Sequence, residues 1–459
     1  MLYALLRSVA GIALRWFYRR IDVEGLDRLP SAAPVILVVN HPNALVDALL
    51  VGWAMPRRIV LTAKSTLFQS PALARFLTWV GVVPLVRSSD VRTVSGTIDP
   101  RRNTLAFGAL RDVLRRGGAV VVFPEGISHD EPSLAPLRTG AARIALEARD
   151  EGGVHGLQIV PVGLTFERKQ TPRTRVLVQV GEPIALDRWN ISGDNAVSAL
   201  TEEIDARLRT VTQNYESIDD ASRAAALSAL FAALFRDEPA SVGSSHSLRI
   251  DVSIAHRIEG ARRALIRGAD GGLRARTDGL LRSLEAFEDR LAIHGISLDD
   301  VSVSAARRHA APFVLRESWV LAIAGPMAFW GTLNHWLPFH GARLIARRSI
   351  ESASDPAMRT IVAGSALVLL FYIAQGALVA WLAGWLVAAL YVASLPLAAD
   401  VNFLLRERLR RARRRARTYL LFRRRPRLHA QLQSELLRLR GEALDVERML
   451  REVGVSEAV

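Results

Sequence analysis

Two short polar segments carry residue types that could transfer a proton. The first, NHPNALVD at residues 40–47, follows the apolar run 34–40 and contains His41 and Asp47. A histidine held by a carboxylate can take a proton from a hydroxyl. A loop after a buried strand also lies where α/β sheets bind ligands. Standing alone, such a pair is more often a structural histidine beside a helix-capping aspartate.

The second segment, FPEGISHD at residues 123–130, shifts that balance because it also follows an apolar run and contains Glu125 and Gly126. A third segment, VPLVRSSD, places Arg87 at the end of another apolar run. Arginine offers a rigid fork of donors that suits a phosphate group. The sequence therefore predicts a polar site where several strands of one sheet end.

The elements that must position these residues follow from the hydrophobic pattern between residues 21 and 215. Short apolar runs alternate there with segments of helical periodicity, which predicts an α/β domain with a mostly buried sheet and flanking helices. We expect strands at 34–40, 58–63, 81–87, 118–126, 157–166 and 175–184, and helices at 103–116 and 140–150.

Taken in order, NHPNALVD, GVVPLVR, FPEGIS and IVPVGL resemble the four sequence blocks of the glycerolipid acyltransferase family, which includes lysophosphatidate and glycerol-3-phosphate acyltransferases. LRTGAARIAL, at residues 137–146, is similar to the helix that follows the family's glutamate block. The resemblance covers roughly residues 21–190. It implies transfer of a fatty acyl group from a thioester, acyl-CoA or acyl carrier protein, to a phosphorylated glycerolipid of the lysophosphatidate type.

One departure from the family pattern concerns the first block. Four residues usually separate its histidine and aspartate, whereas five separate His41 and Asp47. Some glycerol-3-phosphate and dihydroxyacetone-phosphate acyltransferases of yeast type look like this, with the same Val-Asp ending. The resemblance therefore leaves the identity of the acceptor open.

The resemblance also implies roles for the site residues. His41 would be the general base on the acceptor hydroxyl, and Asp47 would orient it and stabilise the imidazolium. Direct attack on the thioester, without an acyl-enzyme, suits a chain that has no cysteine and no GxSxG elbow. Glu125 would hold acceptor hydroxyls or order the site, and Gly126 would let the backbone come close.

Positive charge near the acceptor is expected from two residues. Arg87 would bind the acceptor phosphate, and Lys64, which follows the second strand, would add charge or form an ordinary salt bridge. Of the remaining histidines, only His129, in the same loop as Glu125, is a further candidate for the site. The sequence shows no metal-ligand spacing, so we expect no metal and no cofactor.

Outside this domain, the composition predicts membrane segments. Hydrophobic residues make up 50% of the 459 residues. The uncharged stretch 361–399 is too long for one span and predicts a hairpin of two short helices, with its turn near 376–384. Residues 319–338, in a membrane region 311–400, form a further segment that spans, re-enters or lies at the interface. Residues 1–20 predict an interfacial helix or, as the alternative, an amphipathic core helix. Headgroup-level aromatic residues on it would be Tyr3, Trp16 and Phe17.

The net charge of +15 is concentrated after the hairpin, where residues 401–427 hold twelve arginines and one acid. This asymmetry predicts that both hairpin ends and the acyltransferase domain face the cytoplasm of a bacterial inner membrane. Because the run adjoins the hairpin, we expect membrane phospholipids rather than nucleic acid as its partner, with a purely topological role as the alternative. Residues 216–310 and 401–459 are expected to be helical, the last helix pairing with 270–293 or with a second copy.

Replacing Arg87 tests the predicted phosphate contact. We expect Arg87→Ala to raise the KM for the acceptor far more than the KM for the thioester, because only the acceptor carries the phosphate at this site. Steady-state kinetics with each substrate varied in turn measures both constants. Equal effects on the two constants, or no effect on either, would make Arg87 a structural residue.

Overall fold

The computed structural model describes residues 2–85, 100–191, 193, 195–222, 224–225, 228, 248–249, 251–255, 271–301, 303, 310–348 and 356–452. The chain divides into two compact units. The first unit comprises 1–216 and 345–363, and the second comprises 217–344 and 364–459. Arg87 lies outside the described residues, so its position at the end of a strand remains a prediction.

The first unit alternates strands and helices, as the hydrophobic pattern predicts. Its strands are β1 (Arg20–Glu24), β2 (Val35–Val39), β3 (Ile59–Lys64), β4 (Val83–Leu85), β5 (Ala119–Val122), β6 (Gln158–Phe166), β7 (Arg175–Val180) and β8 (Ile184–Ala185). Its helices are α1 (Leu2–Phe17), α2 (Leu45–Ala54), α3 (Pro71–Val80), α4 (Pro100–Arg115), α5 (Gly140–Asp150) and α6 (Ala196–Val211), with 3₁₀ turns η1 (Leu26–Arg28), η2 (Ser65–Phe68) and η4 (Leu186–Arg188).

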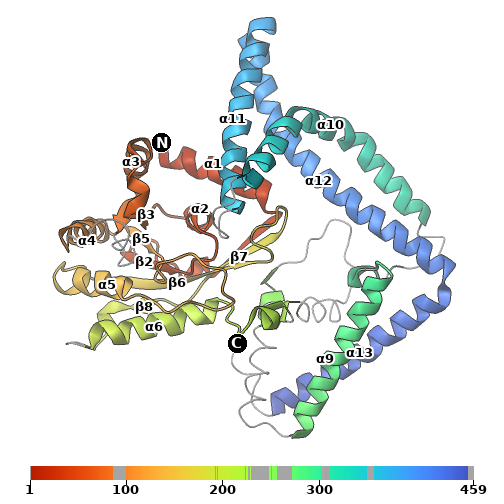
Figure 1. The fold of residues 1–459 in the computed structure, drawn as a ribbon, viewed down its shortest axis with the longest axis horizontal. Helices are drawn as coiled ribbons and strands as arrows, with labels where there is room; N and C mark the ends of the chain where they lie inside the picture. Colours follow the sequence, from red (N-terminus) through yellow and green to blue (C-terminus); the bar gives the residue numbers. More distant parts are fainter. Residues whose placement is uncertain are drawn as a thin grey trace. The chain divides into compact units, whose positions relative to one another are not determined.

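The described strands form one sheet in the order β1-β7-β6-β2-β5-β3-β4, with β8 paired to β6 (Figure 1). Strands β6, β2, β5, β3 and β4 run parallel, whereas β7 and β8 run antiparallel to β6. Loops that follow β2, β5 and β3 therefore leave the same edge of the sheet from neighbouring strands. The fold class is the α/β class that the sequence predicts.

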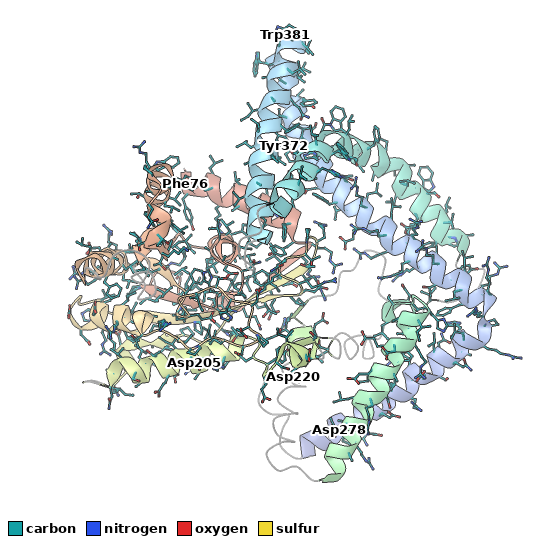
Figure 2. The ribbon with its side chains drawn as sticks, viewed as in Figure 1. Phe76, Asp205, Asp220, Asp278, Tyr372 and Trp381 are labelled. Carbon is teal, nitrogen blue, oxygen red and sulfur yellow. The ribbon has the colours of Figure 1, made fainter. Side chains whose placement is uncertain are left out.

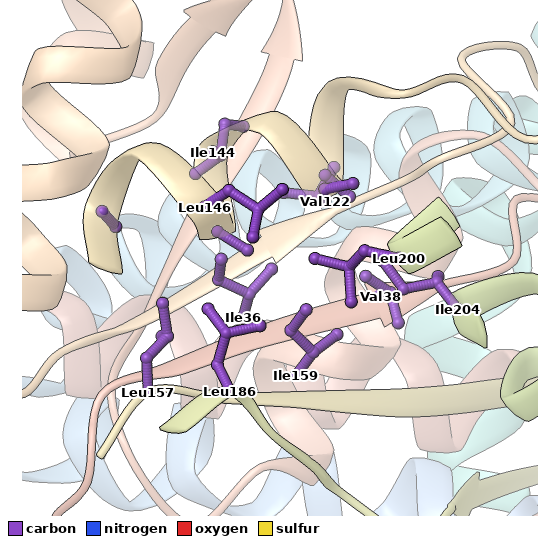
Figure 3. Packing of buried hydrophobic residues seen from close by; sticks show 14 of the residues in the cluster. Ile36, Val38, Val122, Ile144, Leu146, Leu157, Ile159, Leu186, Leu200 and Ile204 are labelled. Atoms are coloured by element: carbon purple, nitrogen blue, oxygen red, sulfur yellow. The ribbon is translucent and has the colours of Figure 1, made fainter. Parts of the chain in front are cut away.

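Both faces of the sheet are covered by helices, which explains why its central strands are apolar without alternation. Ile36 and Val38 of β2 face α4, α5 and α6, and this layer of the core is drawn in Figure 3. Val35 and Leu37 of the same strand face the opposite way, toward Val51 of α2. Burial on both sides fixes the register of β2 and so fixes where the loop at residue 40 begins.

The observed strands differ from the sequence prediction in three places. The apolar run 118–126 leaves the sheet after Val122, so the FPEG segment is a turn beyond the strand. The run 175–184 is two strands, β7 and β8, because Gly181–Pro183 interrupts the ladder. Residues 20–24 form an edge strand, β1, paired with β7, which the sequence pattern did not indicate.

Helix α1 packs against the first unit with one face and leaves the other exposed. Phe17 does not lie at a membrane-facing position as expected, because its side chain is buried with Tyr18 and Val46. The Tyr3 hydroxyl also faces the protein and accepts a hydrogen bond from the backbone N–H of Ile59 at 3.3 Å. Exposed apolar residues remain on the other face: Leu5, Val9 and Ile12. Binding of that face to a membrane surface stays a prediction.

The described elements of the second unit are mainly helices. They are α9 (Gly271–Ile293), η5 (Leu298–Asp300), α10 (Ala310–Arg348), α11 (Pro356–Ala383), α12 (Trp385–Arg424) and α13 (Pro426–Glu452), with the ends of α10 and α11 in the first unit. Helix α13 packs on α9 through a shared apolar cluster, which is the first of the two pairings the sequence left open.

Two of the described helical segments, Thr360–Ala383 and Trp385–Arg424, are long and apolar enough to cross a membrane, by length and composition. The break between them is Gly384, within the range expected for the turn, and its φ of 89° suits glycine. Figure 2 shows Trp381 near the tip of this hairpin and Tyr372 farther from it. The apolar part of α12 continues without a break into its arginine-rich part.

The packing of α6 on β6 gives a stability prediction. A Cβ atom at Gly163 would lie 1.8 Å from the carbonyl oxygen of Val211, whereas one at Gly108 in α4 would meet no atom within 4 Å. We expect Gly163→Ala to lower the free energy of unfolding by about 2–4 kcal/mol through this clash. Gly108→Ala should be neutral or stabilising because alanine favours the helix. Thermal unfolding of both variants checks this, and a Gly163→Ala protein as stable as the wild type would contradict it.

Candidate active site

The turns that follow β2 and β5 meet because these strands are neighbours in the sheet. The backbone N–H of His41 donates to Oε1 of Glu125 at 2.7 Å. This contact joins the first and third sequence blocks directly. Three residues expected in the site, His41, Asp47 and Glu125, are therefore brought together.

His41 and Asp47 form a close pair. Nδ1 of His41 lies 2.9 Å from Oδ2 of Asp47, and the backbone N–H of Asn43 donates to the same oxygen at 2.7 Å. The ring of Phe123 stacks on the imidazole, with centroids 4.1 Å apart. With Nδ1–H donating to the carboxylate, Nε2 is the nitrogen that can accept a proton from a substrate.

The carboxylate of Asp47 is 0% exposed. This burial raises its pKa above the ordinary value, while the hydrogen bonds from His41 and Asn43 and the charge of Lys169 act in the opposite direction. Its second oxygen, Oδ1, has no hydrogen-bond partner among the described residues. A buried carboxylate with a raised pKa beside a histidine is typical of functional sites.

In the five-residue loop between His41 and Asp47, Ala44 has an unusual backbone conformation. Its φ of 49° and ψ of −126° lie in a region that non-glycine residues rarely adopt, at the start of α2. The backbone N–H of Ala44 donates to Oγ of Ser128 at 3.0 Å, across to the Glu125 loop. The five-residue loop thus holds Asp47 against His41 with one residue in a rarely adopted backbone conformation.

Glu125 is only 2% exposed, and protein groups use both of its oxygens. Oε1 accepts from the backbone N–H of His41, and Oε2 accepts from the backbone N–H of Ala135 at 2.9 Å and contacts Nε2 of His129. Of its two expected roles, this geometry fits ordering of the site. Gly126 has a φ of 74°, so the turn itself accounts for glycine at this position.

Lys169 is a site residue that the sequence reasoning missed. Its ammonium group donates to the backbone carbonyl oxygens of Pro42, at 3.1 Å, and His129, at 3.2 Å, and forms an ion pair with Asp130. It thus bridges the His41 loop and the Glu125 loop. The only available signal was its rarity, since the chain has two lysines.

Two asparagines of the first block also hold the site. The side chain of Asn40 exchanges two hydrogen bonds with the backbone of Leu164, at 2.7 and 3.1 Å, and so joins the end of β2 to β6. The side-chain amide of buried Asn43 donates to the Tyr18 hydroxyl at 3.1 Å and to the Lys169 carbonyl oxygen at 3.2 Å. The first block is therefore fixed from both sides.

The structure places Lys64 at the end of β3, exposed and on the same edge of the sheet. Strand β5 separates β3 from β2, so Lys64 ends a strand about 10 Å from the one that carries His41. Its proposed contact with a phosphate remains a prediction. Among the described residues, no group of three or more His, Cys, Asp or Glu could hold a metal ion.

Comparison with known proteins identifies the class of this domain. Residues 20–165 match the protein-family model described as Acyltransferase, which spans the strands and loops that build the site. This part of the chain is an acyltransferase domain, as its four blocks predicted.

Individual relatives are of two kinds. The chain is 36% identical over 122 residues to glycerol-3-phosphate O-acyltransferase 2 of Saccharomyces cerevisiae, covering 26% of this chain and 16% of that one. It is 26% identical over 205 residues to a chloroplastic 1-acyl-sn-glycerol-3-phosphate acyltransferase of Arabidopsis thaliana, covering 43% of this chain and 52% of the other. The chain therefore spans between about a sixth and half of the length of these relatives.

A similar solved structure is that of the 1-acyl-sn-glycerophosphate acyltransferase from Thermotoga maritima. The two chains are 20% identical, with a TM-score of 0.33, and the match covers 45% of this chain and 78% of the other.

The two lysines allow a matched test of the bridge between the loops. Lys169→Met removes a charged donor from two part-buried carbonyl groups, so we expect the free energy of unfolding to fall by about 1.5–3 kcal/mol. Lys64→Met, at an exposed position, should change it by less than about 0.5 kcal/mol. Thermal or denaturant unfolding measures both. Similar values for the two variants would show that the bridge does not hold the loops.

Proposed function

We propose that this chain transfers a fatty acyl group from an acyl thioester to the hydroxyl of a phosphorylated glycerolipid. The observation that carries the proposal is the His41–Asp47 pair, fixed against Glu125 within a domain that matches the Acyltransferase family model. The chain has no cysteine that could form an acyl-enzyme by thiol chemistry.

In the proposed reaction, Nε2 of His41 takes the proton of the acceptor hydroxyl while its oxygen attacks the thioester carbonyl carbon. The resulting imidazolium is stabilised by the carboxylate of Asp47, 2.9 Å from Nδ1. When the tetrahedral intermediate collapses, the carbon–sulfur bond breaks and the proton passes from Nε2 to the leaving thiolate. Proton transfer by a positioned base of this kind contributes roughly 10²–10⁴ in rate.

The acceptor we propose first is a 1-acylglycerol 3-phosphate, as in the relatives named 1-acyl-sn-glycerol-3-phosphate acyltransferase. A second candidate, glycerol 3-phosphate or dihydroxyacetone phosphate, is supported by the five-residue spacing around Ala44 and by the relative from Saccharomyces cerevisiae. Both acceptors carry a phosphate, for which Arg87 and Lys64 are the proposed ligands. The proposed donors are acyl-CoA and acyl carrier protein, and the reaction as written needs no metal or other cofactor.

We also propose that the protein resides in a bacterial inner membrane, with the acyltransferase domain on the cytoplasmic face. Two helical segments of spanning length support a membrane location. The arginines that follow the apolar part of α12 support the orientation and make phospholipid headgroups the proposed partner of that segment. A lipid-binding scaffold with an inactive domain is the non-enzymatic alternative, and the assembled His41–Asp47 pair argues against it.

Two substitutions in the dyad test the reaction. We expect His41→Ala to reduce acyl transfer to a few per cent of the wild type or less, because no base remains. Asp47→Asn should lower kcat by roughly 10²–10⁴, because the neutral amide does not stabilise the imidazolium. The assay uses purified protein, labelled acyl-CoA or acyl carrier protein, and lysophosphatidate, glycerol 3-phosphate and dihydroxyacetone phosphate as separate acceptors.

A stability measurement separates lost catalysis from lost folding. Burial raises the pKa of Asp47 in the folded state, so above that pKa the ionised carboxylate opposes folding. Removing the charge should therefore leave Asp47→Asn at least as stable as the wild type near neutral pH. An Asp47→Asn protein that keeps full activity, or a His41→Ala protein with more than a few per cent, would exclude the proposed mechanism.

A further inference from the structure

Helix α10 is the apolar segment whose relation to the membrane the sequence left open. It runs for 39 residues and contains Pro326 and Pro338. A straight helix of that length would measure about 58 Å, nearly twice the hydrocarbon thickness of a bilayer. Its path can be read from its contacts with α11 and α12, whose shared turn at Gly384 provides a reference point.

Contacts near the two ends of α10 lie at the same end of the α11–α12 hairpin. Near its start, Glu317 makes two hydrogen bonds with Arg408, at 2.7 and 3.0 Å, about 36 Å along α12 from Gly384. Toward its other end, Ala342 lies against Gly364, where an added Cβ would be 3.6 Å away. Gly364 is about 30 Å along α11 from Gly384. Both contacts are therefore far from the hairpin tip.

The middle of α10 lies deeper along the hairpin. A Cβ atom at Gly331 would lie 2.2 Å from the Ala398 carbonyl oxygen, so the two helix backbones approach closely there. His335 lies 2.6 Å from the Tyr372 hydroxyl. Ala398 and Tyr372 are only about 20 Å from Gly384 along their helices. Helix α10 thus rises toward the tip, turns near Pro338 and returns, and Figure 1 shows this curve.

The polarity of this helical bundle is that of a protein surrounded by hydrocarbon. Its buried side chains include polar ones that hydrogen-bond between helices, as Asn334 does with Tyr391 at 2.6 Å and Thr332 with Asn402 at 3.1 Å. Exposed side chains of α10 are apolar over the same depth. Examples are Ile323, Phe329, Leu333, Trp336 and Leu337. In water an exposed apolar face of this size would be unfavourable.

We propose that α10 is a re-entrant membrane helix, whose surroundings are the acyl chains of the bilayer. It enters beside the arginines of α12, reaches Tyr391, about 10 Å along α12 from Gly384, and leaves on the same face. Its polar middle is satisfied by Tyr372, Tyr391 and Asn402 rather than by water, as irregular membrane segments require. The inference rests on the proposed membrane location but not on the acyl-transfer reaction.

Paired cysteines test the return path, and the cysteine-free chain gives no background. Ala342→Cys with Gly364→Cys places two Cβ atoms about 3.6 Å apart, within the disulfide range. We expect this pair to cross-link on oxidation of the full-length protein in native membranes. Ala342→Cys with Ala380→Cys is the matched control, because Ala380 lies near the tip, which only a fully crossing α10 would reach. Cross-linking of the control pair, or none with the first pair, would overturn the proposal.

Single cysteines give an independent measurement with a membrane-impermeant thiol reagent. Ala311→Cys and Arg348→Cys, at the two ends of α10, should be labelled from one side of the membrane, and Gly384→Cys from the other. Labelling of Arg348→Cys from the Gly384 side would mean that α10 crosses. Labelling of all three from one side would overturn the membrane location itself. Acyl transfer by the same variants reports separately on the proposed reaction.

Discussion

The burial of the Asp47 charge is the constraint on which the site depends. A carboxylate without access to water is tolerated only when donors and positive charge are held around it. Here these are His41 Nδ1, the backbone N–H of Asn43 and the nearby charge of Lys169. The first two come from the loop after β2 and the third from the loop after β6, so both loops must be in place before the base is formed.

Much of the first unit could be predicted from the sequence because its physics is local. Strands buried on both faces appear as continuous apolar runs, and the polar segments after them must lie at one edge of a parallel sheet. This reasoning located His41, Asp47 and Glu125 correctly in one place. It failed at the ends of strands, where apolar residues such as Phe123 continue past the last ladder bond to pack on the histidine.

The parts that could not be predicted depend on contacts between distant residues. Lys169 is 127 residues from the carbonyl of Pro42 that it binds, and the side chain of Asn40 pairs with a backbone 124 residues away. No local sequence pattern at Lys169 or Asn40 indicates these contacts. The path of α10 also depends on distant contacts. Its prolines indicate where the helix can bend, but the direction of the bend depends on the contacts of Gly331 and His335 with other helices.

The strained backbone of Ala44 has a consequence for how this site can be recombined with others. The backbone N–H of Ala44 donates to the Ser128 hydroxyl, so the conformation of the first loop and a hydroxyl in the second form one unit. A first block transplanted alone with a loop one residue shorter would have to change the position of this N–H or the start of α2. The loops after β2 and β5 should therefore be exchangeable between proteins only as a pair. A designer would have to move both loops together rather than either sequence motif alone.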